Sequence, residues 1–166
     1  MPKAIDDVIA EAEIRELQMR YCRAVDRMDF DLLRGCFHPD AQTDYGYFGG
    51  DVDAFIAAAR EGLKAYSVTT HFTGNQLIEI DGDSAWAEHY AIATHRTPAD
   101  EQGRERDFVT SVRYIDAIAR RDGTWKLTKR RLILDWSRID IVEQNIVLDV
   151  EMARRDRSDV SYERPD

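Results

Sequence analysis

The sequence predicts an α+β fold in which N-terminal helices cover one face of a curved, mostly antiparallel sheet. Apolar residues recur at helical spacing in about the first 65 residues, and from residue 71 onward the chain is a series of runs rich in β-branched and aromatic residues. The dipeptide Asp122-Gly123, between the last two of these runs, is typical of a tight hairpin. Helices followed by antiparallel strands form an α+β domain, and the space between the two layers is the natural position of a pocket.

The first expected helix runs from Asp6 to about Met28, with Asp6 or Asp7 as its cap, because its apolar residues lie three and four positions apart. A second, short helix ends at a His38-Pro39-Asp40 turn, because the residue before a proline is pushed out of helical geometry. A short strand over 43–48 and a break at 49–51 precede an alanine-rich third helix. The expected helices cover residues 6–28, 29–37 and 52–65.

Four long strands are expected in the second part of the chain, separated by Asp81-Gly82-Asp83, by a polar stretch and by Asp122-Gly123. These strands cover residues 71–80, 84–96, 107–120 and 124–136. The remaining residues, 139–166, form a tail that is apolar from Ile139 to Val150 and charged thereafter. A chain of 166 residues is long enough for one domain, so we expect a single domain over 1–166 with its core at about 10–138.

Composition restricts the partners. With 23 Lys and Arg against 32 Asp and Glu the net charge is −9, which disfavours binding to nucleic acid or to an anionic membrane surface. The first residues carry acidic side chains where a signal peptide needs basic ones, and no apolar run is long enough to cross a bilayer, so we expect a cytoplasmic protein. Cys22 and Cys36 lie in apolar surroundings and are expected to be buried thiols.

His71 opens the first long strand, and alternation puts His71, Thr73 and Asn75 on one face. This polar row has two interpretations. In the first, the face is exposed to solvent or His71 is a hydrogen-bonded core histidine; in the second, the row lines a pocket in which His71 is the general base. Histidine suits the second role because it ordinarily titrates near neutral pH.

Tyr21 and Asp26 lie on or just beyond the first helix. Tyr21 belongs to the apolar stripe, so it faces the sheet, where its hydroxyl needs a partner. Asp26 lies about 140° around an ideal helix from Tyr21, which directs it to solvent unless the helix bends or ends near Val25.

Other polar residues are less specific. His89 and His95 share a face of the second long strand, but no metal-binding motif such as His-Glu-x-x-His is present, so we expect no metal. In Lys129-Arg130-Arg131, alternation directs Arg130 away from its neighbours, and either Arg130 or Arg131 is the inward cation. No glycine-rich phosphate loop, dinucleotide fingerprint or nucleophile elbow occurs, which disfavours nucleotide cofactors and acyl-enzyme chemistry.

Four segments of the chain carry a family resemblance: Ile14-Arg15-Glu16-Leu17 through Tyr21-Cys22-Arg23-Ala24-Val25-Asp26, Phe37-His38-Pro39-Asp40-Ala41, His71-Phe72-Thr73-Gly74-Asn75 and Arg120-Arg121-Asp122-Gly123-Thr124-Trp125-Lys126. They resemble the SnoaL-like branch of the nuclear transport factor 2 superfamily, and the resemblance runs from about residue 10 to about residue 138. The resemblance implies a cone-shaped α+β barrel, also called cystatin-like, around a deep apolar pocket. It further implies a homo-oligomer, either dimer or trimer.

The branch is similar to scytalone dehydratase, bile acid 7α-dehydratase and hexachlorocyclohexane dehydrochlorinase, lyases that use an Asp-His pair and no cofactor. Their motif falls on Asp26 and His71, the tyrosine of the bile acid enzyme falls on Tyr21, and Arg130 best matches an arginine that assists the leaving group. The dehydrochlorinase has a lysine at the position of Tyr21, and the absence of that lysine from this chain argues against halide elimination. A second pocket histidine, as in scytalone dehydratase, is His89 or His95.

The resulting prediction is a cofactor-independent lyase that removes a proton and eliminates water from a small hydrophobic molecule, with Tyr21, Asp26, His71 and Arg130 as its catalytic residues. Aromatic residues near the expected pocket suggest an aromatic or polycyclic substrate. The expected substrate-binding residues are Tyr45, Tyr47, Phe48, Asn75, His89 and Trp136. The alternatives are an isomerase or cyclase using the same pair and a non-catalytic ligand-binding or subunit-stabilising protein, because one fold supports many functions.

Overall fold

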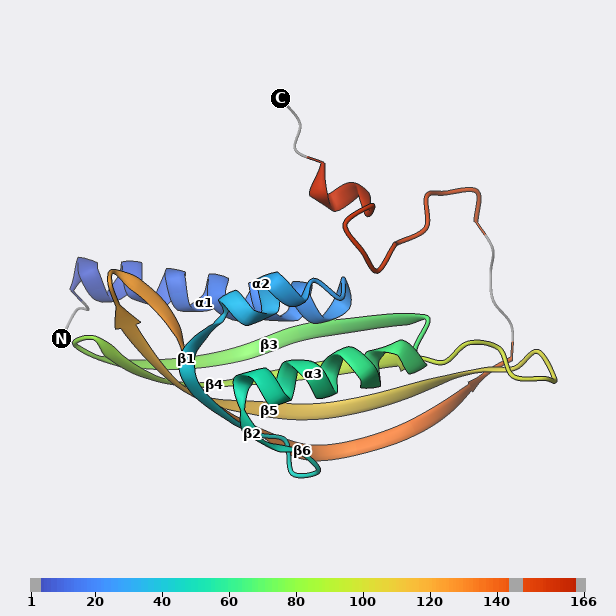
Figure 1. The fold of residues 1–166 in the computed structure, drawn as a ribbon, viewed down its shortest axis with the longest axis horizontal. Coiled ribbons are helices and arrows are strands. Elements are labelled where there is room, and N and C mark those ends of the chain that lie inside the picture. The colour runs from blue at the N-terminus through green and yellow to red at the C-terminus, as the bar shows by residue number, and fades with distance from the viewer. Residues whose placement is uncertain (1–3, 144–147, 164–166) are drawn as a thin grey trace.

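The computed structural model describes residues 4–143 and 148–163 and has the α+β architecture that the sequence predicts (Figure 1). Three α-helices lie on one side of a long, curved sheet of six strands. The helices are α1 (Ile5–Asp26), α2 (Phe30–Gly35) and α3 (Val52–Gly62), with short 3₁₀ turns η1 (Leu63–Ala65) and η2 (Val160–Tyr162). The strands are β1 (Phe37–Asp44), β2 (Gly49–Asp51), β3 (Val68–Asp81), β4 (Ser84–Arg96), β5 (Glu105–Arg121) and β6 (Thr124–Val142).

The sheet has the strand order β2-β1-β6-β5-β4-β3 and does not close, so β2 and β3 are its edges. All neighbouring strands are antiparallel except β1 and β6, which run parallel. The hairpin between β5 and β6 turns at Asp122-Gly123, where both residues have positive φ, 51° and 75°. This is the turn that the Asp-Gly dipeptide favours.

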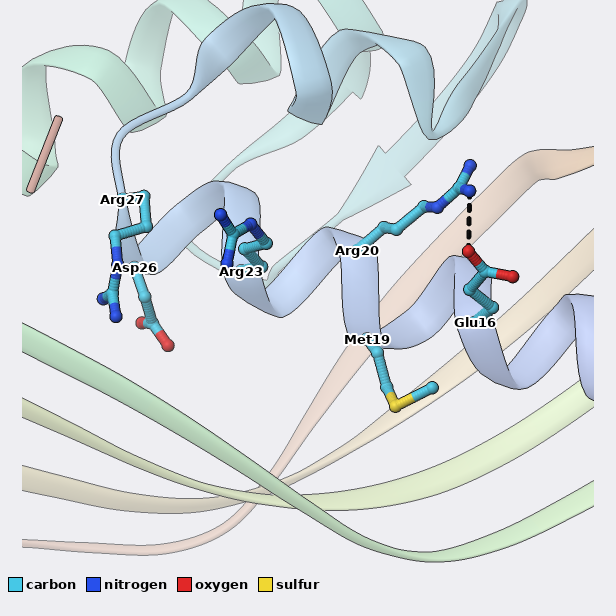
Figure 2. Close-up of a pocket in the computed structure, with 6 residues that line it drawn as sticks. All are labelled: Glu16, Met19, Arg20, Arg23, Asp26 and Arg27. Atoms are coloured by element: carbon cyan, nitrogen blue, oxygen red, sulfur yellow. Dashed lines mark hydrogen bonds and ion pairs between the residues drawn. The ribbon is translucent and has the colours of Figure 1, made fainter. Parts of the chain in front are cut away.

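Helix α1 carries the expected apolar stripe, and the point at which the helix ends decides where the side chain of Asp26 lies. Its cap is Ala4 rather than Asp6 or Asp7, which instead lie in the first turn, where acidic side chains complement the helix dipole. The helix ends at Asp26 because Met28 adopts a left-handed conformation (φ 51°), after which the Asp29 N–H bonds back to the Ala24 carbonyl (2.9 Å). Figure 2 shows the Asp26 side chain leaving the end of the helix toward the strands.

The prediction of a turn at His38-Pro39-Asp40 is wrong, because these residues lie inside β1. The extended backbone that a proline imposes on the preceding residue suits a strand as well as a turn. The residues 45–48 form the loop before β2 rather than a strand. Helix α3 begins as expected after 49–51, with Asp51 as its cap.

Three register shifts interrupt the antiparallel pairing of β3 to β6, one between Thr73 and Gln76 in β3 and two in β6, opposite positions 111/112 and 117/118 of β5. Each inserts one extra residue on one strand and therefore reverses which side chains face the helices beyond it. These bulges decide the positions of several predicted site residues.

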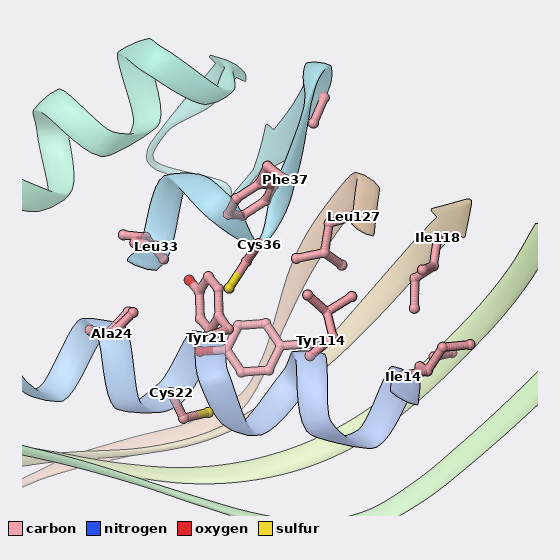
Figure 3. Close-up of a cluster of buried hydrophobic side chains, with 14 of the residues drawn as sticks. Ile14, Tyr21, Cys22, Ala24, Leu33, Cys36, Phe37, Tyr114, Ile118 and Leu127 are labelled. Atoms are coloured by element: carbon pink, nitrogen blue, oxygen red, sulfur yellow. The ribbon is translucent and has the colours of Figure 1, made fainter. Parts of the chain in front are cut away.

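The core lies between the helices and the concave face of the sheet (Figure 3). Tyr21 of α1 makes edge contacts with the rings of Phe37 and Tyr114. Cys22 and Cys36 are both buried free thiols, as the sequence predicts.

The predicted C-terminal tail, residues 139–166, begins within the last strand of the sheet. Residues 139–142 complete β6, and residues 144–147 of the apolar stretch Ile139 to Val150 lie outside the described residues. The segment 148–163 contacts the C-terminal end of α1 through Arg155, whose guanidinium reaches the Asp26 carbonyl. Across 4–143 and 148–163, no helix has both the length and the apolar character that crossing a bilayer requires.

Candidate active site

A cavity of about 530 Å³ lies between the helices and the concave face of the sheet. Its wall combines α1, α3, η1 and strands β3 to β6, and most of its side chains are apolar or aromatic. Tyr45 stacks on Phe55 with a centroid distance of 4.7 Å, which gives one wall a rigid aromatic surface. Of the predicted substrate-binding residues, three line this cavity: Tyr45, Tyr47 and Phe48.

Asp26 and His71 form a doubly hydrogen-bonded pair at the cavity wall. The Nδ1 atom of His71 lies 2.7 Å from Asp26 Oδ1, and the backbone N–H of His71 donates to Asp26 Oδ2 at 2.9 Å. A carboxylate at Nδ1 orients the ring and fixes the tautomer with the lone pair on Nε2. His71 lines the cavity, and Nε2 has no hydrogen-bond partner among the described residues, so it is available to a ligand.

His95 is the second cavity histidine. Its ring meets that of His71 edge to face at a centroid distance of 5.3 Å, and its buried Nδ1 has no hydrogen-bond partner among the described side chains. Burial, assisted by His71, lowers the pKa of His95 to about 4. His95 is therefore neutral at physiological pH and presents no charge to a ligand.

Tyr21 and Tyr45 place two phenol groups in the same wall, with their hydroxyl oxygens 2.5 Å apart. Burial raises the pKa of Tyr21 to about 12, although the nearby positive charge of Arg130 acts in the opposite direction. A phenol that keeps its proton acts as a hydrogen-bond donor, so this pair suits a ligand oxygen.

Arg130 points inward, but it does not line the cavity, which corrects its predicted place beside a leaving group. It is fully buried and donates two hydrogen bonds to Asp116, at 2.8 and 2.7 Å. The guanidinium lies over the rings of Tyr21 (4.1 Å) and Tyr114 (4.4 Å), which separate it from a ligand. Arg131 is the outward cation and pairs with Asp44.

Three other predicted residues also lie outside the cavity wall. His89 is fully buried deeper in the core, stacked on Tyr114 and 3.7 Å from Asp116. Asn75 is exposed because the bulge in β3 makes Gln76, not Asn75, the next residue facing the helices after Thr73. Trp136 pairs with Ser111 across the bulge in β5 and β6 and lies on the opposite face of the sheet, 44% exposed.

A second depression, of about 330 Å³, follows the outer side of α1 and includes one edge of Asp26 (Figure 2). Its arginines already have partners: Arg20 pairs with Glu16 at 2.6 Å, Arg23 donates to the Ser161 carbonyl, and Arg27 pairs with Asp159 at 3.4 Å. The larger cavity, which contains His71, is therefore the better candidate for ligand chemistry.

Several cavity residues escaped prediction from the sequence. Tyr66, Phe108, Thr110 and Leu134 line the cavity but carry no signal that separates a pocket residue from a core residue. Asp116 is the buried partner of the inward arginine, and the sequence does not reveal this pairing. Counting back from the Asp122-Gly123 turn without a bulge places Asp116 opposite Lys129, whereas in the structure it lies opposite Arg130.

Comparison with family models gives a match to the SnoaL-like domain over residues 6–131. This range includes α1 with Asp26 and β3 with His71, and it ends in the middle of β6. The segment 148–163 lies beyond it.

Similar proteins cover most of the chain. The uncharacterized protein Rv2910c of Mycobacterium tuberculosis is 26% identical over 131 residues, which is 76% of this chain and 86% of that protein. A proposed scytalone dehydratase from Novosphingobium aromaticivorans has a TM-score of 0.70 at 19% identity, covering 85% of this chain and 91% of that one. The hexachlorocyclohexane dehydrochlorinase LinA-type3 from Novosphingobium barchaimii has a TM-score of 0.72 at 15% identity, covering 88% and 99%. These structures share the fold of this chain.

Proposed function

The chain belongs to the family of SnoaL-like domains, and from this we propose that it is a cofactor-independent lyase of the dehydratase type. The hydrogen bond between Asp26 and the Nδ1 atom of His71 carries the proposal, because it leaves Nε2 free as a base at the wall of an apolar cavity. Two structures of similar fold, a proposed scytalone dehydratase and a dehydrochlorinase, have names that describe elimination reactions. A third support is the phenol pair of Tyr21 and Tyr45 in the same wall.

In the proposed reaction, Nε2 of His71 removes a proton from a carbon next to a carbonyl group or aromatic ring. The electron pair of that C–H bond forms a C=C bond as the C–O bond on the neighbouring carbon breaks. The proton on Nε2 then passes to the departing oxygen, which leaves as water, so His71 returns to its starting state. Asp26 stabilises the imidazolium that forms between the two steps, as a carboxylate does in other Asp-His pairs.

Tyr21 is proposed to donate a hydrogen bond to the oxygen on which negative charge develops. Its raised pKa supports donation without full proton transfer. Arg130 is proposed to act only through Tyr21, because its guanidinium contacts the face of that ring. This replaces the direct role at the leaving group that the family resemblance implies.

A small hydrophobic, aromatic or polycyclic substrate is the class that the cavity supports best. Its volume of about 530 Å³ is within the range of small-molecule sites, and its lining is mostly apolar with few polar groups. Stacking surfaces such as the Tyr45 and Phe55 rings favour a flat ring system.

The direct test is a screen of cyclic β-hydroxy ketones and of aromatic compounds that carry a hydroxyl group on the second saturated carbon from the ring, with product mass as the readout. Loss of 18 mass units, the mass of water, identifies elimination, whereas an unchanged mass with a new chromatographic peak identifies the isomerase alternative. His71→Ala and Asp26→Asn should each abolish turnover with little change in melting temperature, while Asp31→Asn on the exposed side of α2 should leave turnover unchanged. Full activity in both site variants would overturn the proposal, and tight binding without turnover would favour the binding-protein alternative.

We also propose that the chain forms a homo-oligomer through the convex face of the sheet. Phe72, Ile92, Ser111 and Trp136 are aligned across β3 to β6 on the face opposite His71, and the three large side chains are exposed. An exposed apolar row of this kind is typical of an association surface. Light scattering after gel filtration should give a mass of two or three chains, and Phe72→Glu should reduce it to that of one chain. A wild-type mass of one chain would contradict the proposal.

A further inference from the structure

The segment 148–163, which lies beyond the part matched by the family model, crosses the end of α1 where the Asp26-His71 pair is formed. It is fastened by contacts that do not involve this pair. Arg157 and the Tyr162 hydroxyl both bind the Asp29 carboxylate, at 3.1 and 2.9 Å, and Arg23 donates to the Ser161 carbonyl at 3.0 Å. The segment therefore has its own attachment to α1 and α2.

Arg155 extends from this segment to four oxygen atoms, which lie on α1, on η1, on the residue that follows η1 and on β3. Its Nε donates to the carbonyl of Asp26, the last residue of α1, at 3.4 Å. Its terminal nitrogens donate to the carbonyls of Leu63 and Tyr66, at 3.0 and 2.5 Å, and to the Thr69 hydroxyl at 3.3 Å. A planar guanidinium with five fixed N–H groups can join several acceptors in this way, which a lysine cannot.

Each acceptor belongs to a part of the chain that fixes the candidate site. The Asp26 carbonyl is one of those at a helix end that have no partner within the helix. Thr69 lies two residues before His71 on the same face of β3, an edge strand whose outward N–H groups lack a neighbouring strand. Tyr66 lines the cavity. One side chain thus joins the backbone that carries Asp26 to the strand that carries His71.

We propose that Arg155 is a positioning residue that holds Asp26 in register with His71. None of its hydrogen bonds goes to His71, and it acts through the end of α1 and the start of β3. The Asp26 carbonyl and the Thr69 hydroxyl are held by one rigid group, so the carboxylate of Asp26 meets both the ring and the backbone N–H of His71. Any effect of Arg155 on catalysis rests on the proposed lyase function, whereas its effect on the position of Asp26 relative to His71 does not.

Electrostatics agree with this arrangement. Burial lowers the pKa of Arg155, and the negative charge of Asp26 opposes that effect. The negative charge of Asp26 therefore stabilises the partly buried guanidinium of Arg155.

The test follows the two hydrogen bonds of the pair by NMR of the ¹⁵N-labelled full chain, with no substrate present. In the wild-type protein we expect a downfield ring N–H signal from His71 and slow exchange of its backbone amide. Arg155→Gln should weaken the ring signal and accelerate amide exchange by about tenfold or more, because the end of α1 is no longer held. Arg155→Lys should be intermediate, and guanidinium ion added to Arg155→Gln should restore part of the protection.

Arg157→Ala is the matched control, because it removes an arginine of the same segment that binds Asp29 and not the pair. It should leave both His71 signals at their wild-type values. Equal changes in Arg157→Ala and Arg155→Gln would overturn the proposal, because they would show a general loosening of the segment, and so would unchanged His71 signals in Arg155→Gln. If the NMR result holds but the substrate screen finds no turnover, the positioning role of Arg155 stands and only the proposed lyase function fails.

Discussion

The hydroxyl groups of Tyr21 and Tyr45 share one hydrogen bond, with their oxygens 2.5 Å apart, in the wall of a cavity that also contains His71. Each phenol has a single proton, so one of the two protons joins the oxygens and the other remains for a ligand. The positive charge of Arg130 lies behind Tyr21 at 4.1 Å from its ring centre. This arrangement links a buried ion pair to the cavity without exposing a charge in it.

The first prediction concerns this phenol pair. Tyr21→Phe and Tyr45→Phe should each lower the free energy of unfolding by about 1 kcal/mol, because each removes the same buried hydrogen bond. The double variant should therefore lose clearly less than the sum of the two single losses. Urea denaturation of the four proteins measures this coupling. Strictly additive losses would show that the hydroxyls do not interact.

The second prediction concerns Arg130 and Asp116, both fully buried. Arg130→Met leaves a buried carboxylate without its partner and should cost about 3–5 kcal/mol of unfolding free energy, and Asp116→Leu should cost a similar amount. The double variant Arg130→Met with Asp116→Leu should recover much of the loss, because no unpaired charge remains. Chemical denaturation gives the four values.

The control for this pair is Arg20→Met, because Arg20 pairs with Glu16 where both side chains are more than half exposed. It should change stability little. A double variant at Arg130 and Asp116 that is as unstable as the two single losses combined would contradict the second prediction.

The third prediction concerns the two thiols. Burial raises the pKa of Cys22 to about 12 and that of Cys36 to about 11, so neither forms thiolate near neutral pH. In the native protein at pH 8, both should react with an aromatic disulfide reagent far more slowly than in urea, where two thiols per chain should react at once. Rapid native reaction of one equivalent would show that one of the two sites opens to solvent.

Hydropathy periods and the Asp122-Gly123 turn are enough to predict the layers of this fold, because helices and antiparallel strands differ in period over long segments. Side-chain direction could not be predicted beyond a bulge. In β6, Trp125 and Leu127 face the core, and simple alternation would continue with Lys129 and Arg131. The extra residue opposite 117/118 instead turns Arg130 inward. The same effect removes Asn75 and Trp136 from the cavity wall.

Asp26 illustrates the limit of a helical wheel. On a continuing helix it would face solvent, but the helix ends at that residue, and its side chain reaches His71. The end is set by Met28 in a left-handed conformation and by contacts with Asp29 and Arg155, and none of these is encoded by a glycine or a proline. The family resemblance pointed to Asp26, whereas spacing alone pointed away from it.

The fourth prediction concerns acid stability. Burial, assisted by the charge of Arg130, lowers the pKa of His89 from 6.5 to about 4. Between these values the unfolded chain binds a proton at this ring that the folded chain does not, so this contribution to stability is complete above about pH 6.5 and is lost as the pH falls toward 4. The loss from His89 amounts to at most about 3 kcal/mol.

His89→Leu removes this titration, so its free energy of unfolding, measured in urea at several pH values, should fall less steeply than that of the wild type between about pH 6.5 and pH 4. Ile118→Val, at another buried core position, should instead shift the whole curve down by a similar amount at every pH. If His89→Leu and Ile118→Val gave parallel curves, His89 would not be the group whose protonation opposes folding, and His95, whose pKa burial likewise lowers to about 4, would be the next residue to replace.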